Sequence, residues 1–225
     1  MEKTNESNPY KVVLLGESGV GKTCIIAQFT SGTFDANTVT SLTAQFIRKT
    51  MEFADKKVIT FDIWDTAGQE KYRSLAKIFY KDAKAIVLVY DITSKDSFVQ
   101  MKEYWYEQIK QQGNKDVIIA VAANKGDLYE KRVISNEEGE EFAKQIGAIF
   151  ATTSAKDDSG ILELFQNLGR KIMDPTYDAA AVTKKQKSDY EKEKRKQKLA
   201  EEREGRQGTV KLSNATAKKE KKGCC

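Results

Sequence analysis

The chain has 225 residues, with 38 Lys and Arg against 33 Asp and Glu, and it contains no His. This length suits one ordinary domain with a modest extension and argues against two large domains. The lack of His excludes zinc sites and catalytic triads built on imidazole, and a total of three Cys excludes a disulfide framework. No apolar stretch could span a bilayer and the first eight residues have no signal-peptide core, so we expect a protein made and kept in the cytosol.

A phosphate-binding motif follows the first apolar run. Residues 16–23 have the sequence GESGVGKT, which fits the pattern Gly, four free positions, Gly, Lys and Ser or Thr. Residues 12–15 predict a buried strand before it and residues 24–29 a helix after it, the context that the motif requires. The alternative is a Gly-rich turn that fits by chance, and the flanking elements argue against it. The predicted phosphate-binding residues are Gly16, Ser18, Gly19, Val20, Gly21, Lys22, Thr23 and Cys24.

The chemistry of this loop follows from its backbone and two side chains. Its backbone N–H groups and the positive end of the following helix dipole would receive phosphate oxygens. Lys22 would reach the terminal phosphates, and the Thr23 hydroxyl would be offered to Mg²⁺, a hard cation that prefers oxygen ligands.

Strands and helices alternate along the rest of the chain. Further strands are predicted at 46–53, 58–64, 85–90, 117–122 and 148–151, and helices at 70–80, 97–111, 136–146 and 161–173. The first two of these strands form a hairpin, and residues 31–45 are expected to be a mobile loop. Alternation implies parallel pairing through right-handed crossovers. The predicted fold is α/β: a doubly wound, mostly parallel six-stranded sheet with helices on both faces.

The last helix marks a change in composition. Asp174-Pro175 ends it, and the chain from there carries 15 basic and 9 acidic residues, against 23 and 24 in the first 173. We predict a flexible N-terminus at 1–9, a nucleotide-binding domain at 10–173 and a basic, disordered tail at 174–225. The tail lacks the aromatic platform of single-stranded nucleic acid binders, so no nucleic acid partner is expected.

Three further polar loops each follow a predicted strand. They begin at Asp65 (DTAGQ), Asn124 (NKGD) and Ser154 (SAK). Ligands of α/β sheets bind outside the carboxyl ends of the strands, so these loops and the phosphate loop should converge. Taken singly, each has a plain structural alternative, as a helix cap or a turn. Their joint occurrence in this order favours a nucleotide site.

These loops make the chain similar to the small GTPases of the Ras superfamily, and to the Rab family most closely, from about Tyr10 to Met173. Four segments favour the Rab family over the other families of the superfamily. They are residues 63–70 (IWDTAGQE), 72–75 (YRSL) and 88–93 (LVYDIT) and the final Cys224-Cys225. The resemblance implies the small G-protein form of the P-loop NTPase fold, with GTP or GDP and Mg²⁺ bound. It implies a switch in vesicle trafficking that hydrolyses GTP slowly without an activating protein and recruits effectors to a membrane while GTP is bound.

The resemblance also assigns site residues. Asp127 would accept hydrogen bonds from the guanine ring N–H and amine, a donor pair that adenine lacks. Asn124 would hold the loops together. The other base-side residues would be Phe34, Lys125, Ser154, Ala155 and Lys156, and the phosphate-side residues Ser41, Gly68 and Gln69. Gln69 would orient the attacking water, and Mg²⁺ would be held by Thr23, by Ser41 and, through water, by Asp65.

Two loops, 34–45 and 67–80, would change with the nucleotide, beside an aromatic set of Phe46, Trp64 and Phe79. The family has Thr, Ile and Gly where this chain has Ser41-Leu42-Thr43. Because Thr lacks the backbone freedom of Gly, we hypothesise a less populated closed state or a different set of partners. An alternative function is therefore a GTP-binding module with weak hydrolysis. A P-loop kinase of small molecules is disfavoured by the Asn124 loop.

Two cysteines end the sequence behind the basic cluster at 218–222. Rab proteins carry two geranylgeranyl groups at such an ending, and two lipids with nearby basic residues give stable anchoring. The expected location is the cytoplasmic face of an endomembrane compartment, with cycling through the cytosol. The implied partners are an exchange factor, a GTPase-activating protein, a GDP-dissociation inhibitor, a prenylation escort protein and effectors.

Overall fold

The computed structural model describes residues 8–36, 45–66 and 76–181. The chain divides into two compact units, Met1–Tyr177 and Asp178–Cys225. In the second unit only residues 178–181 are described, where the Asp178 carboxylate accepts hydrogen bonds from the N–H groups of Ala180 and Ala181. The described strands and helices between Tyr10 and Met173 belong to the first unit.

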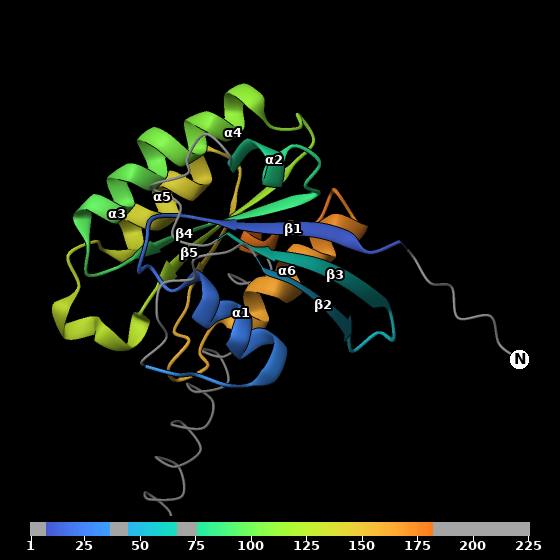
Figure 1. Cartoon of the computed structure of the whole chain (residues 1–225), viewed down its shortest axis with the longest axis horizontal. Helices are drawn as coiled ribbons and strands as arrows, with labels where there is room; N and C mark the ends of the chain where they lie inside the picture. Colours follow the sequence, from blue (N-terminus) through green and yellow to red (C-terminus); the bar gives the residue numbers. More distant parts are fainter. Residues whose placement is uncertain (1–7, 37–44, 67–75, 182–225) are drawn as a thin grey trace, which may run out of the picture. The chain divides into compact units, whose positions relative to one another are not determined.

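A six-stranded sheet with the order β2-β3-β1-β4-β5-β6 forms the centre of this unit (Figure 1). The strands are β1 (Tyr10–Leu15), β2 (Gln45–Glu52), β3 (Val58–Asp65), β4 (Ala85–Asp91), β5 (Ile118–Asn124) and β6 (Ile149–Thr152). β2 pairs antiparallel with β3, and the other described pairs are parallel. The predicted mostly parallel α/β sheet is confirmed.

Helices cover both faces of the sheet. They are α1 (Lys22–Ser31), α2 (Ala76–Tyr80), α3 (Lys95–Gln100), the π-helix η2 (Met101–Tyr106), α4 (Glu107–Gln112), the 3-10 helix η3 (Gly126–Lys131), α5 (Asn136–Gln145) and α6 (Ile161–Met173). Successive residues of a buried strand point to opposite faces, so both faces need cover. On one face Leu88 and Val121 pack with Phe98 and Trp105. On the other, Phe29 of α1 and Phe165 of α6 stack with their ring centroids 3.8 Å apart.

The helix predicted at 97–111 differs from expectation at its start and in its middle. It begins at Lys95, because the Ser94 hydroxyl accepts a hydrogen bond from the N–H of Ser97 and caps the first turn. Its middle, Met101–Tyr106, is a π-helix. Of the helix predicted at 70–80, the structure describes α2, and residues 70–75 lie outside the described ranges. Among the helices of the described ranges, none has the length and apolar character to cross a bilayer.

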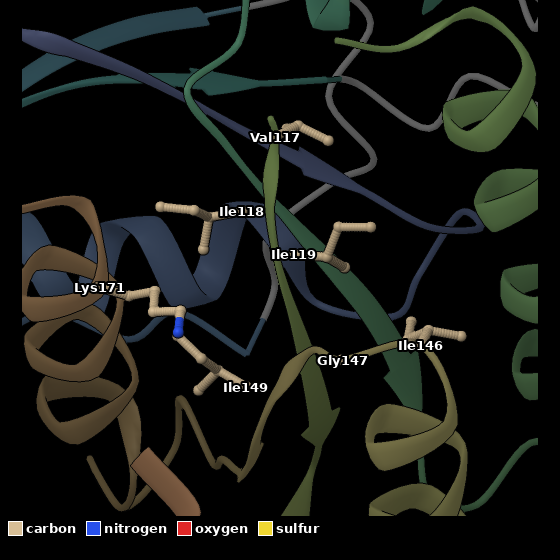
Figure 2. Close-up of a pocket in the computed structure, with 7 residues that line it drawn as sticks. All are labelled: Val117, Ile118, Ile119, Ile146, Gly147, Ile149 and Lys171. Atoms are coloured by element: carbon tan, nitrogen blue, oxygen red, sulfur yellow. The ribbon is translucent and has the colours of Figure 1, made fainter. Parts of the chain in front are cut away.

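A small pocket of about 150 Å³ lies where β5 and β6 begin (Figure 2). Ile118 and Ile119 point to opposite sides of β5, and Lys171 approaches from α6. The other lining residues are Val117, Ile146, Gly147 and Ile149. The pocket is therefore at the amino ends of the strands, whereas the predicted site residues follow their carboxyl ends, and it is smaller than the roughly 300 Å³ at which ligand clefts usually begin.

Candidate nucleotide-binding site

The phosphate loop connects β1 to α1 through three glycines with positive φ. The φ angles are 151° at Gly16, 74° at Gly19 and 96° at Gly21. A Cβ atom at Gly16 would lie 2.2 Å from the Val89 carbonyl oxygen, and one at Gly21 would lie 2.4 Å from Nδ2 of Asn124. Both positions therefore require glycine, for backbone conformation and for space.

Lys22, Thr23 and Asp65 form a polar cluster at the start of α1, in which Lys22 and Asp65 are buried. Lys22 is 5% exposed, and its Nζ donates to the carbonyl oxygens of Gly16 and Glu17, at 2.8 Å each. The Thr23 hydroxyl donates to Oδ2 of Asp65 at 2.7 Å. The other carboxylate oxygen of Asp65, Oδ1, is buried without a hydrogen-bond partner among the described residues.

Asp65 ends β3 and is 2% exposed. Burial raises the pKa of its carboxyl group, while the hydrogen bond from Thr23 and the charge of Lys22 act in the opposite direction. A buried carboxylate oxygen without a partner is costly unless a cation or a donor completes its surroundings. The cluster therefore has the chemistry of a site for a divalent cation and phosphate.

Asn124 joins the phosphate loop to two loops on the other side of the site. Its Nδ2 donates to the Val20 carbonyl oxygen at 2.7 Å, and its Oδ1 accepts from the Thr153 hydroxyl at 3.1 Å. Asn124 is 2% exposed, so these bonds are sheltered from water. One side chain thus contacts loops 104 and 29 residues away in sequence.

The loops after β5 and β6 are also bonded to each other. The Gly126 N–H donates to the Thr153 carbonyl at 2.9 Å, and the Ser154 hydroxyl donates to Oδ1 of Asp127 at 2.7 Å. Ser154 and Ala155 are buried at this junction, and Lys156 is exposed beyond it. The Asp127 carboxylate is therefore oriented by a contact within the chain.

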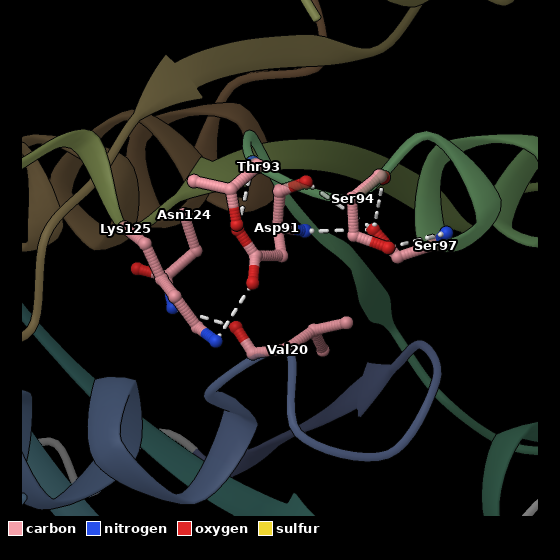
Figure 3. Close-up of polar contacts among 7 residues, drawn as sticks. All are labelled: Val20, Asp91, Thr93, Ser94, Ser97, Asn124 and Lys125. Carbon is pink, nitrogen blue, oxygen red and sulfur yellow. Dashed lines mark hydrogen bonds and ion pairs between the residues drawn. The ribbon is translucent and has the colours of Figure 1, made fainter. Parts of the chain in front are cut away.

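Asp91, at the end of β4, holds Lys125 in place (Figure 3). Its Oδ2 lies 2.7 Å from Nζ of Lys125, and its Oδ1 accepts from the N–H and hydroxyl of Thr93 at 2.8 and 2.7 Å. The Asp91 N–H donates to the Ser97 hydroxyl at 3.0 Å. Lys125 has φ 65°, uncommon for a residue other than glycine, so the ion pair stabilises a strained residue of the Asn124 loop.

The structure brings together most predicted site residues that it describes. The phosphate loop, Asp65 and the Asn124 and Ser154 loops meet at the carboxyl edge of the sheet, joined by the bonds given above. Phe34 lies on the segment after α1 and is 40% exposed, with no described contact to these loops. Ser41, Gly68, Gln69, Cys224 and Cys225 lie outside the described residues.

Sequence reasoning missed Asp91, Thr153 and Trp105. The sequence does hold a signal for Asp91, because it is a polar residue at the end of a predicted strand, as Asp65 and Asn124 are. Thr153 directly precedes the Ser154 loop, but nothing in the pattern pairs it with Asn124. Trp105 donates from Nε1 to Oε1 of Glu17 at 2.9 Å across 88 residues, which no spacing rule indicates.

Comparison with known proteins identifies the family. The model of the Ras family matches residues 11–174. The chain is 42% identical to Ras-related protein Rab-31 of Homo sapiens over 167 residues, which is 73% of this chain and 85% of that protein. It is 40% identical to Ras-related protein Rab-22A of Homo sapiens over 169 residues, 75% of this chain and 85% of that protein. It is 38% identical to Ras-related protein Rab-5A of Dictyostelium discoideum over 172 residues, 76% of this chain and 85% of that protein. The chain therefore belongs to the Ras family and, within it, to the Rab small GTPases, which bind and hydrolyse GTP and act in vesicle trafficking.

Proposed function

We propose that the Asn124 and Ser154 loops bind the guanine base and that the phosphate loop binds the phosphates. Asp127 accepts hydrogen bonds from the ring N–H and the amine of guanine. Lys125, Ala155 and Lys156 complete the side of the site that binds the base. The observation that carries this proposal is the Asn124 side chain, which bonds to Val20 on the phosphate loop and to Thr153 beside the Ser154 loop. Phe34 is proposed to stack on the base from its exposed segment.

Thr23 and Ser41 are the proposed direct ligands of Mg²⁺, with Asp65 holding it through water. The buried, partnerless Oδ1 of Asp65 supports this assignment, because such an atom fits beside a hydrated cation. When bound, Mg²⁺ supplies positive charge to the phosphate oxygens. Lys22 adds a second charge, the Gly68 N–H contacts the γ-phosphate, and Gln69 orients the attacking water.

Replacing Asp127 by Asn tests the base assignment. An amide loses one acceptor and gains a donor, so the variant should bind GDP roughly 100-fold or more weakly and prefer xanthosine diphosphate, whose base has a carbonyl where guanine has its amine. The measurement is fluorescence competition between the two nucleotides on the full chain. Asp116→Asn, the same change at an exposed residue before β5, should leave affinity unchanged. An unaltered preference for GDP in Asp127→Asn contradicts the assignment.

We propose that Cys224 and Cys225 each receive a geranylgeranyl group and that the lipids anchor the chain to an endomembrane. The basic residues at 218–222 support attraction to an anionic leaflet. Prenylation in a cell extract should add two lipid masses to the wild type, one to each single Cys→Ser variant and none to the double variant. Lipid on the double variant, or its continued sedimentation with membranes, contradicts the proposal.

The proposed partners are those that a prenylated switch needs: an exchange factor, a GTPase-activating protein, a GDP-dissociation inhibitor, an escort protein for prenylation, and effectors. An aromatic row supports an effector surface, since Phe46 and Trp64 have ring centroids 5.5 Å apart and Trp64 and Phe79 6.1 Å apart. Phe46 is 48% exposed. The weak-hydrolysis alternative rests on Ser41 and Thr43, outside the described residues, and no described observation favours it.

A further inference from the structure

Trp105 connects the π-helix to the phosphate loop. Its indole Nε1 donates to Oε1 of Glu17 at 2.9 Å, and Trp105 itself is 1% exposed. Glu17 is the second residue of the phosphate loop, and its backbone oxygen accepts from Nζ of Lys22 at 2.8 Å. Glu17 is thus linked through its side chain to the helix and through its backbone to the lysine proposed to bind phosphate.

The helix holds this indole firmly. Trp105 lies inside the π-helix Met101–Tyr106, which continues directly from α3 and into α4. Met101, one turn before it, is fully buried, and the ring of Tyr104 meets the indole edge-on with centroids 5.1 Å apart. π-helices are rare and are found frequently at functional sites. A hydrogen bond from a rigid, buried donor to a carboxylate is charge-assisted and stronger than a neutral one.

We propose that Trp105 is a positioning residue for the phosphate loop, acting through Glu17. By fixing the Glu17 side chain it fixes the backbone carbonyl that Lys22 contacts, and so sets where the Lys22 ammonium lies. Releasing Glu17 lets the loop relax and shortens the time for which GDP stays bound. This inference rests on the proposed nucleotide site. It means that a helix outside the nucleotide-binding loops also controls how long the nucleotide stays bound.

The dissociation rate of a fluorescent GDP analogue from the Mg²⁺-loaded full chain tests the proposal. Trp105→Phe keeps a ring but loses the N–H, and Glu17→Ala loses the acceptor, so each should raise the rate about three- to tenfold. The double variant should be no faster than the faster single variant, because both remove the same bond. Glu17→Gln keeps an acceptor oxygen and should stay within about twofold of wild type. Tyr106→Phe is the matched control, since that neighbouring ring packs on Phe142.

A spectroscopic readout separates positioning from general stability. The chain has two Trp, so in a Trp64→Phe background the emission reports Trp105 alone. We expect this emission to change between the nucleotide-free and GDP-bound chains, and Glu17→Ala to abolish the change. If Trp105→Phe fails to fold, the comparison of Glu17→Ala with Glu17→Gln still decides.

Three results would each overturn the proposal. The first is a double variant whose GDP dissociation rate rises by the product of the two single effects, and the second is an equal rise in Glu17→Ala and Glu17→Gln. The third is a Trp105 emission that does not change when GDP binds. These outcomes differ from failure of the nucleotide site. If the wild-type chain does not bind GDP, the proposed site is wrong; if it binds GDP and the variants match it, only the role of Trp105 is wrong.

Discussion

The base side and the phosphate side of the site differ in how far the chain itself provides partners for their polar side chains. On the base side, Asn124, Asp127 and Lys125 each have a partner within the chain, in Val20, Ser154 and Asp91 respectively. On the phosphate side, Oδ1 of Asp65 is buried without a partner among the described residues. Lys22 there donates to carbonyl oxygens of its own loop.

We infer from this difference that contacts within the chain organise the base side, and that bound Mg²⁺ and phosphate would complete the phosphate side. Preorganised groups lose little entropy on binding, so they favour recognition of one base. Polar groups that the bound cation and phosphates complete are stabilised only when these are present. This property suits a switch that distinguishes nucleotides by their phosphates. Single substitutions on each side test this difference.

Gly21→Ala should have the largest effect, because Gly21 lies where the two sides meet. The new Cβ would fall 2.4 Å from Nδ2 of Asn124, at a φ of 96°. GDP affinity should fall roughly 100-fold or more, through this clash and the strain of a positive φ. Gly32→Ala is the control, since its φ is 64° and its Cβ meets nothing within 4 Å. It should lower the free energy of unfolding by about 1–2 kcal/mol and leave GDP affinity unchanged. Wild-type affinity in Gly21→Ala contradicts the account.

Asp65→Asn should have opposite effects on two properties: it should stabilise the fold and weaken the dependence of GDP binding on Mg²⁺. Removing a buried charge should raise the free energy of unfolding of the nucleotide-free chain by about 1 kcal/mol. Chelating Mg²⁺ should speed GDP release roughly tenfold or more in wild type and much less in this variant. Asp62→Asn is the control on the same strand, where an exposed pair with Arg48 is lost; it should keep the wild-type response to chelation. A strong response in Asp65→Asn excludes Asp65 from the metal site.

Asp91→Asn tests whether the base side depends on partners within the chain. The ion pair with Lys125 is lost, so the strained Lys125 backbone is held less firmly and GDP dissociation should quicken about five- to tenfold. Release kinetics at constant Mg²⁺ measure this, with Asp116→Asn as the exposed control. Equal rates in the two variants would show that Lys125 needs no support from Asp91.

Ser154→Ala should have the smallest effect, about threefold in GDP affinity, because it removes a single hydrogen bond, from a neutral hydroxyl to the Asp127 carboxylate. Ser159→Ala removes a hydroxyl from the same loop, one that bonds to Asp157, and should change nothing. Calorimetry of GDP binding distinguishes them. A larger loss from Ser159 than from Ser154 argues against the Ser154–Asp127 bond as part of the base site.

The sheet and its polar loops could be predicted because they depend on local pattern. Continuous apolar runs such as residues 85–90 indicate buried parallel strands, and the carboxyl ends of parallel strands meet at one edge. The cluster of Lys22 with Asp65 follows from that rule without knowledge of any contact. The pairing of Glu17 with Trp105 does not, because it depends on how a helix 88 residues away is rotated against the loop.

Two local features also escaped prediction for physical reasons. The residues buried along the third helical segment, Phe98, Met101, Trp105 and Ile109, have a spacing that an α-helix satisfies equally well, so periodicity alone cannot reveal the π-helix. In the NKGD loop, Lys125 rather than Gly126 has the positive φ, and it caps η3, which begins at Gly126. The ion pair with Asp91 supports that choice, and it exists only in the folded chain.

Hydrogen exchange on the nucleotide-free and GDP·Mg²⁺-bound full chain tests the difference between the two sides most directly. The N–H groups of Gly126, Thr153 and Ser154 bond to carbonyls within the chain, so they should be protected in both states. The N–H groups of residues 17–22 should exchange quickly without nucleotide and become protected at least about tenfold on binding. Equally fast exchange on both sides of the nucleotide-free chain would contradict the account, as would a phosphate loop already protected without ligand.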